Sequence, residues 1–382
     1  MASKIAIIRG DGIGPEVIEQ DVKVLNKISD LYNIGLYYDF IEAGGKYFLE
    51  TGKEWQPDAL KKCKQADAIL KGPVGYIDPK TGKEVRREDG RLAGHIAVVG
   101  LRQELELFAN VRPIKVYKGV RFKVSQEYYP DIYTSKNVDM VFVRENTEGL
   151  YANREPRIKK TAIRRIIKEV VSDCVISKKA TERIVKYAFD MAKKMKGRPL
   201  DGKKIVTCID KSNATISHRF FRDVFNRVAS KYKDVEHNHE YADSFAGLLL
   251  LQPEYYNILV GPNMVMDILS DEAANLQGGR GVAPSANIGY NHAAFEAIHG
   301  SAPKMAGLDI ANPIAIVRSS AMMLDWLSEK KNDKNLHLAA ELIERAVGEL
   351  IREGTYLTQD MGGESKCSQI GSALLRKIEE LY

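Results

Sequence analysis

The stretch Ile5-Ala-Ile-Ile-Arg-Gly-Asp-Gly-Ile-Gly-Pro15 decides the fold of this chain. Its apolar residues 5–8 predict a buried strand, and the glycines that follow turn the chain. Pro15 suits the first turn of a helix, which we predict to run to about residue 31. The glycine spacing is not the Rossmann fingerprint G-x-G-x-x-G, because the third glycine comes one position early and proline follows it.

Apolar runs of strand length alternate with longer amphipathic stretches along the chain, which predicts an α/β protein. We expect further strands at residues 36–41, 66–70, 138–143, 205–209 and 257–260. We expect helices at 264–274, 312–329, 334–353 and 367–381, and a polar, helical region over 160–196. The glycine-rich segments 71–94 and 278–289 predict a long loop and a domain boundary, respectively.

Length and composition predict a folded protein with two domains and a reducing environment. The chain has 382 residues, of which 44% are hydrophobic and 28% charged, which is typical of globular proteins. The four cysteines lie far apart without ligand-like spacing, which argues against disulfides and zinc. No apolar run approaches the ~20 residues needed to cross a bilayer, so we expect a cytoplasmic protein without a membrane partner.

The net charge of +6 could attract an anionic substrate, but it fits a solvated basic surface as well. The chain has no basic stripe with interleaved aromatic residues, so we expect no nucleic-acid partner.

Two aspartates, Asp267 and Asp271, lie four residues apart, so on a helix they share one face. A hard divalent cation would stabilise two carboxylates at this spacing, and Asp243 could supply a third. The alternative is a solvated helix face whose carboxylates pair with arginine or lysine.

Three arginines, Arg102, Arg112 and Arg144, each close or follow an apolar segment. A guanidinium at the end of a strand binds carboxylates with two hydrogen bonds, so a convergent trio would hold a polycarboxylic acid. Separate surface salt bridges are the alternative.

Tyr151 and Lys211 are candidates for acid–base chemistry. Tyr151 ends a polar loop after a predicted strand, and Lys211 follows the strand at 205–209, where open α/β sheets bind ligands. A neighbouring cation would lower the pKa of the lysine and make it a usable base. Structural roles remain the alternative for both. A second glycine-rich segment, His299-Gly-Ser-Ala-Pro-Lys304, could approach a nucleotide phosphate through its backbone N–H groups.

Together these segments resemble the isocitrate/isopropylmalate dehydrogenase family over nearly the whole chain. The motifs are Gly10-Asp-Gly-Ile-Gly-Pro-Glu16, Leu70-Lys-Gly-Pro73, Leu101-Arg-Gln-Glu-Leu105, Asn110-Val-Arg-Pro113, Arg144-Glu-Asn-Thr-Glu-Gly-Leu-Tyr151, Lys211-Ser-Asn213, Asp267-Ile-Leu-Ser-Asp-Glu272, Ala283-Pro-Ser-Ala-Asn-Ile-Gly289, His299-Gly-Ser-Ala-Pro303 and Ala311-Asn-Pro313.

The resemblance implies an isopropylmalate dehydrogenase-like fold, with two α/β domains around a cleft, rather than a Rossmann fold. The large, cofactor-binding domain would comprise residues 1–115 and 279–382, and the small domain, for substrate, metal and dimerisation, residues 116–278. The family is homodimeric, and the equivalents of Lys211 and Asp243 come from the partner subunit.

The resemblance also implies roles for individual residues. Mg²⁺ or Mn²⁺ would be held by Asp243, Asp267 and Asp271; Lys211 would be the base in the oxidation, and Tyr151 the proton donor. The expected substrate-binding residues are Arg102, Arg112, Arg144, Lys71, Asn213, Ile96 and Val98. The expected cofactor-binding residues are His299, Gly300, Ser301, Ala302, Lys304, Asn312 and Tyr356.

The substrate and cofactor signals conflict. Lys304 favours NADP over NAD, because a cation suits the 2′-phosphate, and we predict NADP-dependent oxidative decarboxylation of isocitrate. However, isocitrate enzymes of the family carry Ser-x-Asn where this chain has Ile96 and Val98. Apolar residues there resemble 3-isopropylmalate or homoisocitrate enzymes, so those substrates remain alternatives. A non-catalytic regulatory subunit is a further alternative, although the chain keeps the lysine, tyrosine, aspartates and arginines.

Overall fold

The computed structural model describes residues 2–152, 157–160 and 167–382. Packing divides the chain into two compact units. The first unit comprises Met1–Leu107, Val111–Asp139 and Asp271–Tyr382, and the second comprises Phe108–Asn110 and Met140–Ser270. Residues 116–139 and 271–278, which we predicted to lie in the small domain, therefore pack with the first unit. The division into functional domains after residues 115 and 278 remains a prediction.

The first unit contains a mostly parallel sheet. Its strands follow the order β15 (Pro284–Ile288), β16 (Ala293–Ala297), β3 (Ala68–Lys71), β1 (Ser3–Ile8) and β2 (Leu36–Ile41). The strand β15 runs antiparallel to β16, whereas β16, β3, β1 and β2 pair in parallel. The first unit also contains two short hairpins, β4 (Ile77–Asp78) with β5 (Lys83–Glu84) and β7 (Arg121–Val124) with β8 (Glu127–Pro130).

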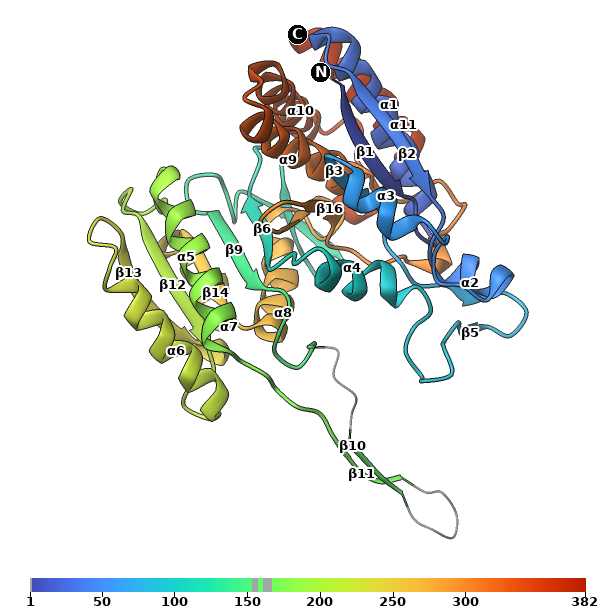
Figure 1. The fold of residues 1–382 in the computed structure, drawn as a ribbon. Coiled ribbons are helices and arrows are strands. Elements are labelled where there is room, and N and C mark those ends of the chain that lie inside the picture. Colours follow the sequence, from blue (N-terminus) through green and yellow to red (C-terminus); the bar gives the residue numbers. More distant parts are fainter. Residues whose placement is uncertain (1, 153–156, 161–166) are drawn as a thin grey trace. The chain divides into compact units, whose positions relative to one another are not determined.

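Helices cover both faces of this sheet. On one side, the helices α1 (Gly14–Tyr32), α9 (Ile314–Lys331), α10 (Lys334–Glu353) and α11 (Cys367–Leu381) pack together, and α9 contacts β15 and β16 (Figure 1). On the other side, α3 (Ala59–Gln65) and α4 (Val99–Glu104) bury Cys63 and Leu101 against Ala6 and Ile8 of β1. Alternate side chains of β1 thus serve different layers, as expected for a parallel strand buried on both faces.

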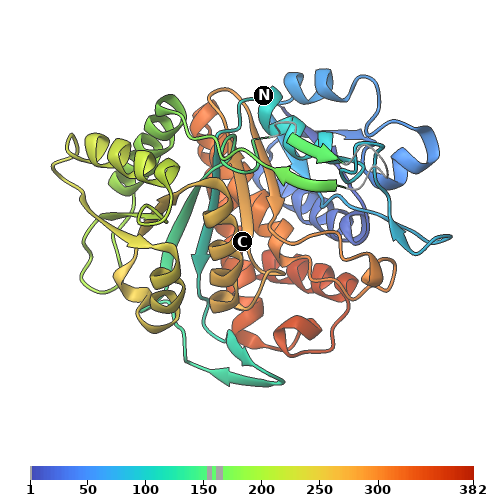
Figure 2. The ribbon, with the colours of Figure 1, turned by 90° about the horizontal axis from the view of Figure 1, so that it is seen from below.

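The second unit contains a parallel sheet in the order β13 (Glu236–Tyr241), β12 (Ile205–Asp210), β14 (Ile258–Gly261) and β9 (Asp139–Glu145). β12 and β14 are buried throughout, and β13 is an exposed edge. Figure 2 shows this unit from below, with the helices α5 (Lys178–Lys194), α6 (Ile216–Ala229) and α7 (Ala242–Leu251). The strands β10 (Arg157–Lys160) and β11 (Ile167–Val171) pair with each other in antiparallel orientation.

Two elements belong in part to each unit. The strand β6 (Ala109–Lys115) begins in the second unit and ends in the first. The helix α8 (Asn263–Ala273) begins in the second unit, and its residues from Asp271 onward are assigned to the first.

The structure confirms the predicted α/β class and corrects three details. The predicted helical region over 160–196 was wrong at its start, because Ile167–Val171 is a strand and the helix begins only at Lys178; residues 161–166 lie outside the described residues. The predicted connection at 278–289 contains the buried strand β15. The predicted loop at 71–94 contains the strands β4 and β5. A short helix from earlier in the chain, α2 (Gly45–Thr51), packs against β4. No helix in the described part of the chain is both long and apolar enough to span a bilayer.

Candidate active site

Predicted site residues of the second unit follow the carboxyl ends of neighbouring parallel strands. Arg144 is the penultimate residue of β9, Lys211 directly follows β12, and Asp243 is the second residue of α7, directly after β13. The helix that follows β14 carries Asp267. The carboxyl edge of a parallel sheet is where ligands bind in open α/β folds, so the topology brings these groups to the predicted edge.

Lys211 and Asp243 form an ion pair. The Lys211 Nζ lies 2.6 Å from Asp243 Oδ1, and both side chains are accessible to solvent. The hydrogen bond from Lys211 lowers the pKa of Asp243. The Lys211 N–H donates to His218 Nδ1 at 3.0 Å, so the imidazole fixes the turn that presents the lysine. Burial lowers the pKa of His218, which favours the neutral ring that can accept this bond. Asn213 lies in the same turn and is exposed.

Arg144 is buried and held by the helix that follows β14. Its Nε donates to Asn263 Oδ1 at 2.8 Å, and its Nη1 donates to Asp267. The Cζ atom lies 5.7 Å from the centre of the Tyr151 ring, within reach of a cation–π interaction. Tyr151 is 41% exposed, so part of its side chain is open to solvent. The predicted substrate arginine, metal ligand and proton donor therefore lie together.

A second arginine–aspartate pair lies in the first unit. Arg112 Nη1 donates to Asp271 Oδ1 at 2.9 Å, and Arg280 approaches the other carboxylate oxygen at 3.7 Å. Asp267 and Asp271 occupy successive turns of α8, as predicted. Oxygen donors of this kind fit Mg²⁺ or Mn²⁺, and each carboxylate is partly exposed. Within the described residues of this single chain, no group of three or more acidic, cysteine or histidine side chains is arranged to hold a metal ion.

Lys71 and Arg102, both predicted to bind substrate, contact one buried carboxylate. Glu296 on β16 pairs with Lys71 and accepts from Arg102 Nη2 at 3.2 Å. Asn287 Nδ2 donates to the same carboxylate at 2.8 Å. Two cations around one anion leave a net positive charge, which suits an anionic substrate.

Ile96 and Val98 precede Arg102 on the same short helical segment. Ile96 lies in a 3₁₀ turn, His95–Ala97, and Val98 is the N-terminal cap of α4. The Arg102 N–H donates to the Val98 carbonyl at 3.3 Å, so the two residues are one turn apart on one face. Both apolar side chains are half-buried.

A pocket of about 630 Å³ in the first unit contains most of the predicted cofactor residues. His299, Gly300, Ala302 and Asn312 line it, together with Arg280 and Asp360, which the sequence did not indicate. His299 Nε2 is buried and has no hydrogen-bond partner in the described part of the chain, and burial lowers the pKa of the ring. His299 thus brings a neutral imidazole with an unsatisfied nitrogen to the wall of a pocket that glycines also line, and such a wall fits a nucleotide.

The two glycine-rich motifs contact each other beside this pocket. The Ile13 N–H donates to the Ser301 carbonyl at 2.9 Å. At Gly12, which has a φ of +59°, a Cβ atom would lie 1.9 Å from that carbonyl oxygen. Only glycine permits this approach.

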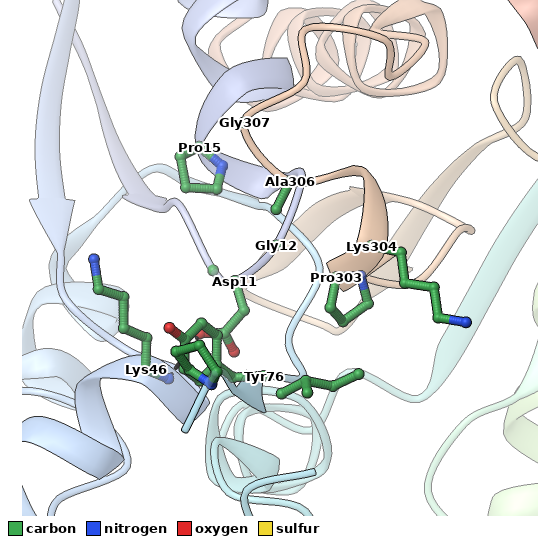
Figure 3. A pocket seen from close by; sticks show the side chains of 12 residues that line it. Asp11, Gly12, Pro15, Lys46, Tyr76, Pro303, Lys304, Ala306 and Gly307 are labelled. Carbon is green, nitrogen blue, oxygen red and sulfur yellow. Dashed lines mark hydrogen bonds between the residues drawn. The ribbon is translucent and has the colours of Figure 1, made fainter. Parts of the chain in front are cut away.

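Lys304 and Tyr356 do not line the same pocket as His299. Lys304 lines a neighbouring pocket of about 540 Å³ with Gly12 and Lys46. Figure 3 shows Lys46 and Lys304 on opposite sides of Asp11 and Gly12, with Lys304 extending away from Asp11. The Tyr356 ring lies 5.3 Å from the Arg376 guanidinium.

The sequence did not indicate four residues of the site: Glu296, Asn263, Arg280 and Asp360. Glu296 lies inside the segment Phe295-Glu-Ala-Ile-His299 and Asn263 lies four residues before Asp267. Both are buried polar residues beside charged ones, but burial could not be read from their positions in the sequence. Asp360 lies in a 3₁₀ turn, Gln359–Met361, and it lines the pocket although it is far in sequence from the motif at His299.

Comparison with known proteins supports the resemblance over the whole chain. The family described as isocitrate/isopropylmalate dehydrogenase matches residues 4–374. A homoisocitrate dehydrogenase of Methanocaldococcus jannaschii is 36% identical, covering 99% of this chain and 98% of that protein. A 3-isopropylmalate dehydrogenase of Aquifex aeolicus is also 36% identical, with the same coverage.

Solved structures agree with the sequence comparisons. The crystal structure of an isocitrate dehydrogenase from Methylococcus capsulatus has a TM-score of 0.81 and 33% sequence identity, covering 99% of both chains. The predicted isopropylmalate dehydrogenase-like fold is thereby confirmed. The chain therefore belongs to the isocitrate/isopropylmalate dehydrogenase family and is a metal-dependent, decarboxylating dehydrogenase.

Proposed function

We propose that this enzyme oxidises and decarboxylates a malate with an apolar substituent at C3, such as 3-isopropylmalate, with a nicotinamide dinucleotide. The observation that carries this proposal is the position of Val98 one turn before Arg102 on the same helical face. An acid whose carboxylate pairs with Arg102 would present its substituent to Val98 and Ile96. A γ-carboxylate there would lose its hydrogen bonds to water without replacement, whereas an alkyl group would gain from burial.

The sequence led us to predict isocitrate first, and the comparisons favour the alternative. Curated relatives at 34–36% identity are named 3-isopropylmalate or homoisocitrate dehydrogenases, whereas the isocitrate dehydrogenase is a structural neighbour. Among these acids, the apolar pair Ile96 and Val98 favours the alkyl-substituted one. Homoisocitrate, which carries a carboxylate on a longer substituent, is the second candidate.

The proposed chemistry assigns each charged group one task. Arg102, Arg112 and Arg144 bind the carboxylates of the substrate and orient it by paired hydrogen bonds. A divalent cation held by Asp243, Asp267 and Asp271 would polarise the C2 oxygen and stabilise negative charge there during loss of CO₂. Lys211 accepts the proton of the C2 hydroxyl as the hydride leaves for the nicotinamide. Tyr151 then donates a proton to C3 after the carboxylate there has left.

The nucleotide would occupy the pocket around His299, Gly300, Ala302 and Asn312, with Ser301 supporting the loop beneath it. Lys304 remains our predicted determinant for the 2′-phosphate of NADP, and Tyr356 a predicted contributor. Asp360 lines the pocket and would oppose a second anion there, so NADP preference depends on the balance between Lys304 and Asp360.

We propose that the active enzyme is a homodimer in which Lys211 and Asp243 serve the site of the other subunit. Exposed apolar residues on successive helices of the second unit support this proposal: Ile216 on α6, Leu251 on α7 and Ile268 on α8 are 90%, 76% and 60% exposed. Apolar side chains this exposed are typical of surfaces that associate.

The substrate assignment is tested by steady-state kinetics with 3-isopropylmalate, 3-methylmalate, homoisocitrate and isocitrate, with Mg²⁺ and each dinucleotide. We expect kcat/KM for 3-isopropylmalate to exceed that for isocitrate by at least ~10-fold. The double variant I96S/V98N should move this ratio towards isocitrate. A wild-type ratio that favours isocitrate, unchanged in the double variant, would show the proposal to be wrong.

A further inference from the structure

A buried amide, that of Asn263, connects the proposed substrate arginine to the loop that carries the proposed proton donor. Asn263 is the first residue of α8 and is 2% exposed. Its Oδ1 accepts from Arg144 Nε at 2.8 Å, and its Nδ2 donates to the Glu148 carbonyl at 2.9 Å. A guanidinium can only donate and a carbonyl can only accept, so both ends of the amide are chemically determined.

The first of these bonds fixes the plane of the Arg144 guanidinium. Asn263 and Asp267 are four residues apart on α8, and they accept from Nε and Nη1 of the same arginine. Two contacts to one turn of helix leave the planar group little freedom to rotate. An arginine that is held in this way can meet a carboxylate without first losing conformational entropy.

The second bond ties down the segment that leads to Tyr151. A Cβ atom at Gly149, where φ is +83°, would lie 3.2 Å from the Asn263 Cβ, so glycine allows the loop to approach the amide. Other bonds hold the same loop: the Thr147 and Glu148 N–H groups donate to Glu145, and Gly149 pairs with Val175. The loop would therefore keep its overall path without Asn263, but Glu148 would lose its link to α8.

We propose that Asn263 is a positioning residue that sets Arg144 and the Tyr151 loop in register with each other. The inference rests on the proposed function, because Arg144 and Tyr151 are there assigned to the substrate carboxylate and to proton donation. One amide thus coordinates the group that holds the acid and the group that protonates the product. Asp cannot replace it because a carboxylate has no donor, and Leu cannot because it has no polar group. Ser cannot because its side chain is too short to reach both partners.

Two variants separate the two bonds. N263A removes both, so we expect KM for the acid to rise and kcat to fall, each by roughly 10-fold. N263D restores an acceptor for Arg144 but places an oxygen against the Glu148 carbonyl. It should recover part of the loss in KM and none of the loss in kcat.

Hydrogen–deuterium exchange over residues 144–151 supplies a readout that does not need turnover. We expect faster exchange in both variants, by roughly 10-fold, because the Glu148 link is lost in each. The matched control is N335D, since the exposed Asn335 also donates from Nδ2 to a carbonyl, that of Tyr32, at 3.2 Å. N335D should leave kinetics and exchange unchanged.

The outcomes are distinct. Wild-type exchange over 144–151 in N263A, with kcat and KM within twofold of wild type, would overturn the inference. If N263A does not fold, N263D alone decides through its exchange and its kcat. If the wild-type chain oxidises none of the acids, the proposed function fails, while the exchange experiment still shows whether Asn263 positions the loop.

Discussion

Lys71 and Glu296 are register partners on the adjacent parallel strands β3 and β16, and their side chains form an ion pair inside the first unit. Arg102, from α4, contacts the other oxygen of the same carboxylate. Burial alone would raise the pKa of Glu296, but the charges of Lys71 and Arg102 outweigh burial and hold the pKa well below its ordinary value. The carboxylate therefore joins two strands and a helix at the edge where the substrate is proposed to bind.

Removing the charge of Glu296 should destabilise the protein strongly. E296Q leaves the buried Lys71 and the partly buried Arg102 without a neutralising partner, and we expect a loss of about 3–5 kcal/mol in the free energy of unfolding. The pKa of Glu296 is lower in the folded than in the unfolded state. The ionised carboxylate therefore stabilises the fold at pH values above its unfolded-state pKa, and this stabilisation is lost as pH falls through the folded-state pKa. E296Q should thus show a weaker acid dependence. Urea titration measures both effects, with E19Q, at an exposed i,i+4 pair with Lys23, as the control. A change below about 1 kcal/mol would contradict the argument.

Ionisation of the buried Asp21 should destabilise the folded protein as pH rises. It is fully buried on α1, Ser320 donates to one of its oxygens at 2.6 Å, and burial raises its pKa from 3.8 to about 8. Between these two values the folded state binds a proton that the unfolded state does not, so stability decreases as pH increases through this window. We expect the free energy of unfolding of D21N, relative to that of wild type, to increase by about 2–4 kcal/mol between pH 4 and pH 8.

Thermal or urea unfolding of D21N at several pH values measures this difference. D30N, at an exposed aspartate of the same helix, is the control and should show no such trend. A D21N curve parallel to wild type would mean that Asp21 ionises freely in the folded protein.

Reversing the charge of Lys304 should change the dinucleotide preference. We expect K304D to lower kcat/KM for NADP by roughly 10–100-fold and that for NAD by less than about threefold, because only NADP carries the 2′-phosphate. K233D makes the same charge change at an exposed position of the second unit and should leave the ratio unchanged. An unaltered NADP/NAD ratio in K304D would remove this lysine from the site and leave Asp360 as the residue to vary.

Mixing two inactive variants should restore activity if the sites are shared. K211M and D267N each remove one proposed group, and a hybrid dimer would contain one site with both groups intact. With random exchange of subunits, about a quarter of the wild-type activity should return. Activity that stays absent after verified subunit exchange would show that Lys211 and Asp267 serve the same subunit's site.

Much of the fold could be predicted from the sequence because the hydrophobic periodicity is strong. The strand predicted at 36–41 and the helices at 334–353 and 367–381 agree closely with β2, α10 and α11. The segment 167–171 was not recognised, because Ile167-Lys-Glu-Val-Val171 is stabilised by antiparallel pairing with β10 rather than by a local pattern.

The site could be predicted only as far as charged motifs reveal it. Asp267, Arg144 and Lys211 could be named because they stand in motifs at the ends of strands. Asn263 and Glu296 could not be named, because their hydrogen bonds leave no local signal in the sequence. Asn263 is 119 positions from Arg144, and Glu296 is 194 positions from Arg102. Lys304 was placed by its motif, but the backbone turn at Ala302–Met305 directs it to the pocket beside the one that His299 lines.

The central claim is that this chain couples hydride transfer to decarboxylation in a metal-dependent reaction. The most direct test measures reduced dinucleotide and released CO₂ together, from 3-isopropylmalate, before and after removal of divalent metal by a chelator. The account predicts equal amounts of the two products, loss of at least ~100-fold in rate on chelation, and recovery with Mg²⁺ or Mn²⁺. Full turnover in the metal-free protein, or reduced dinucleotide without CO₂, would contradict it.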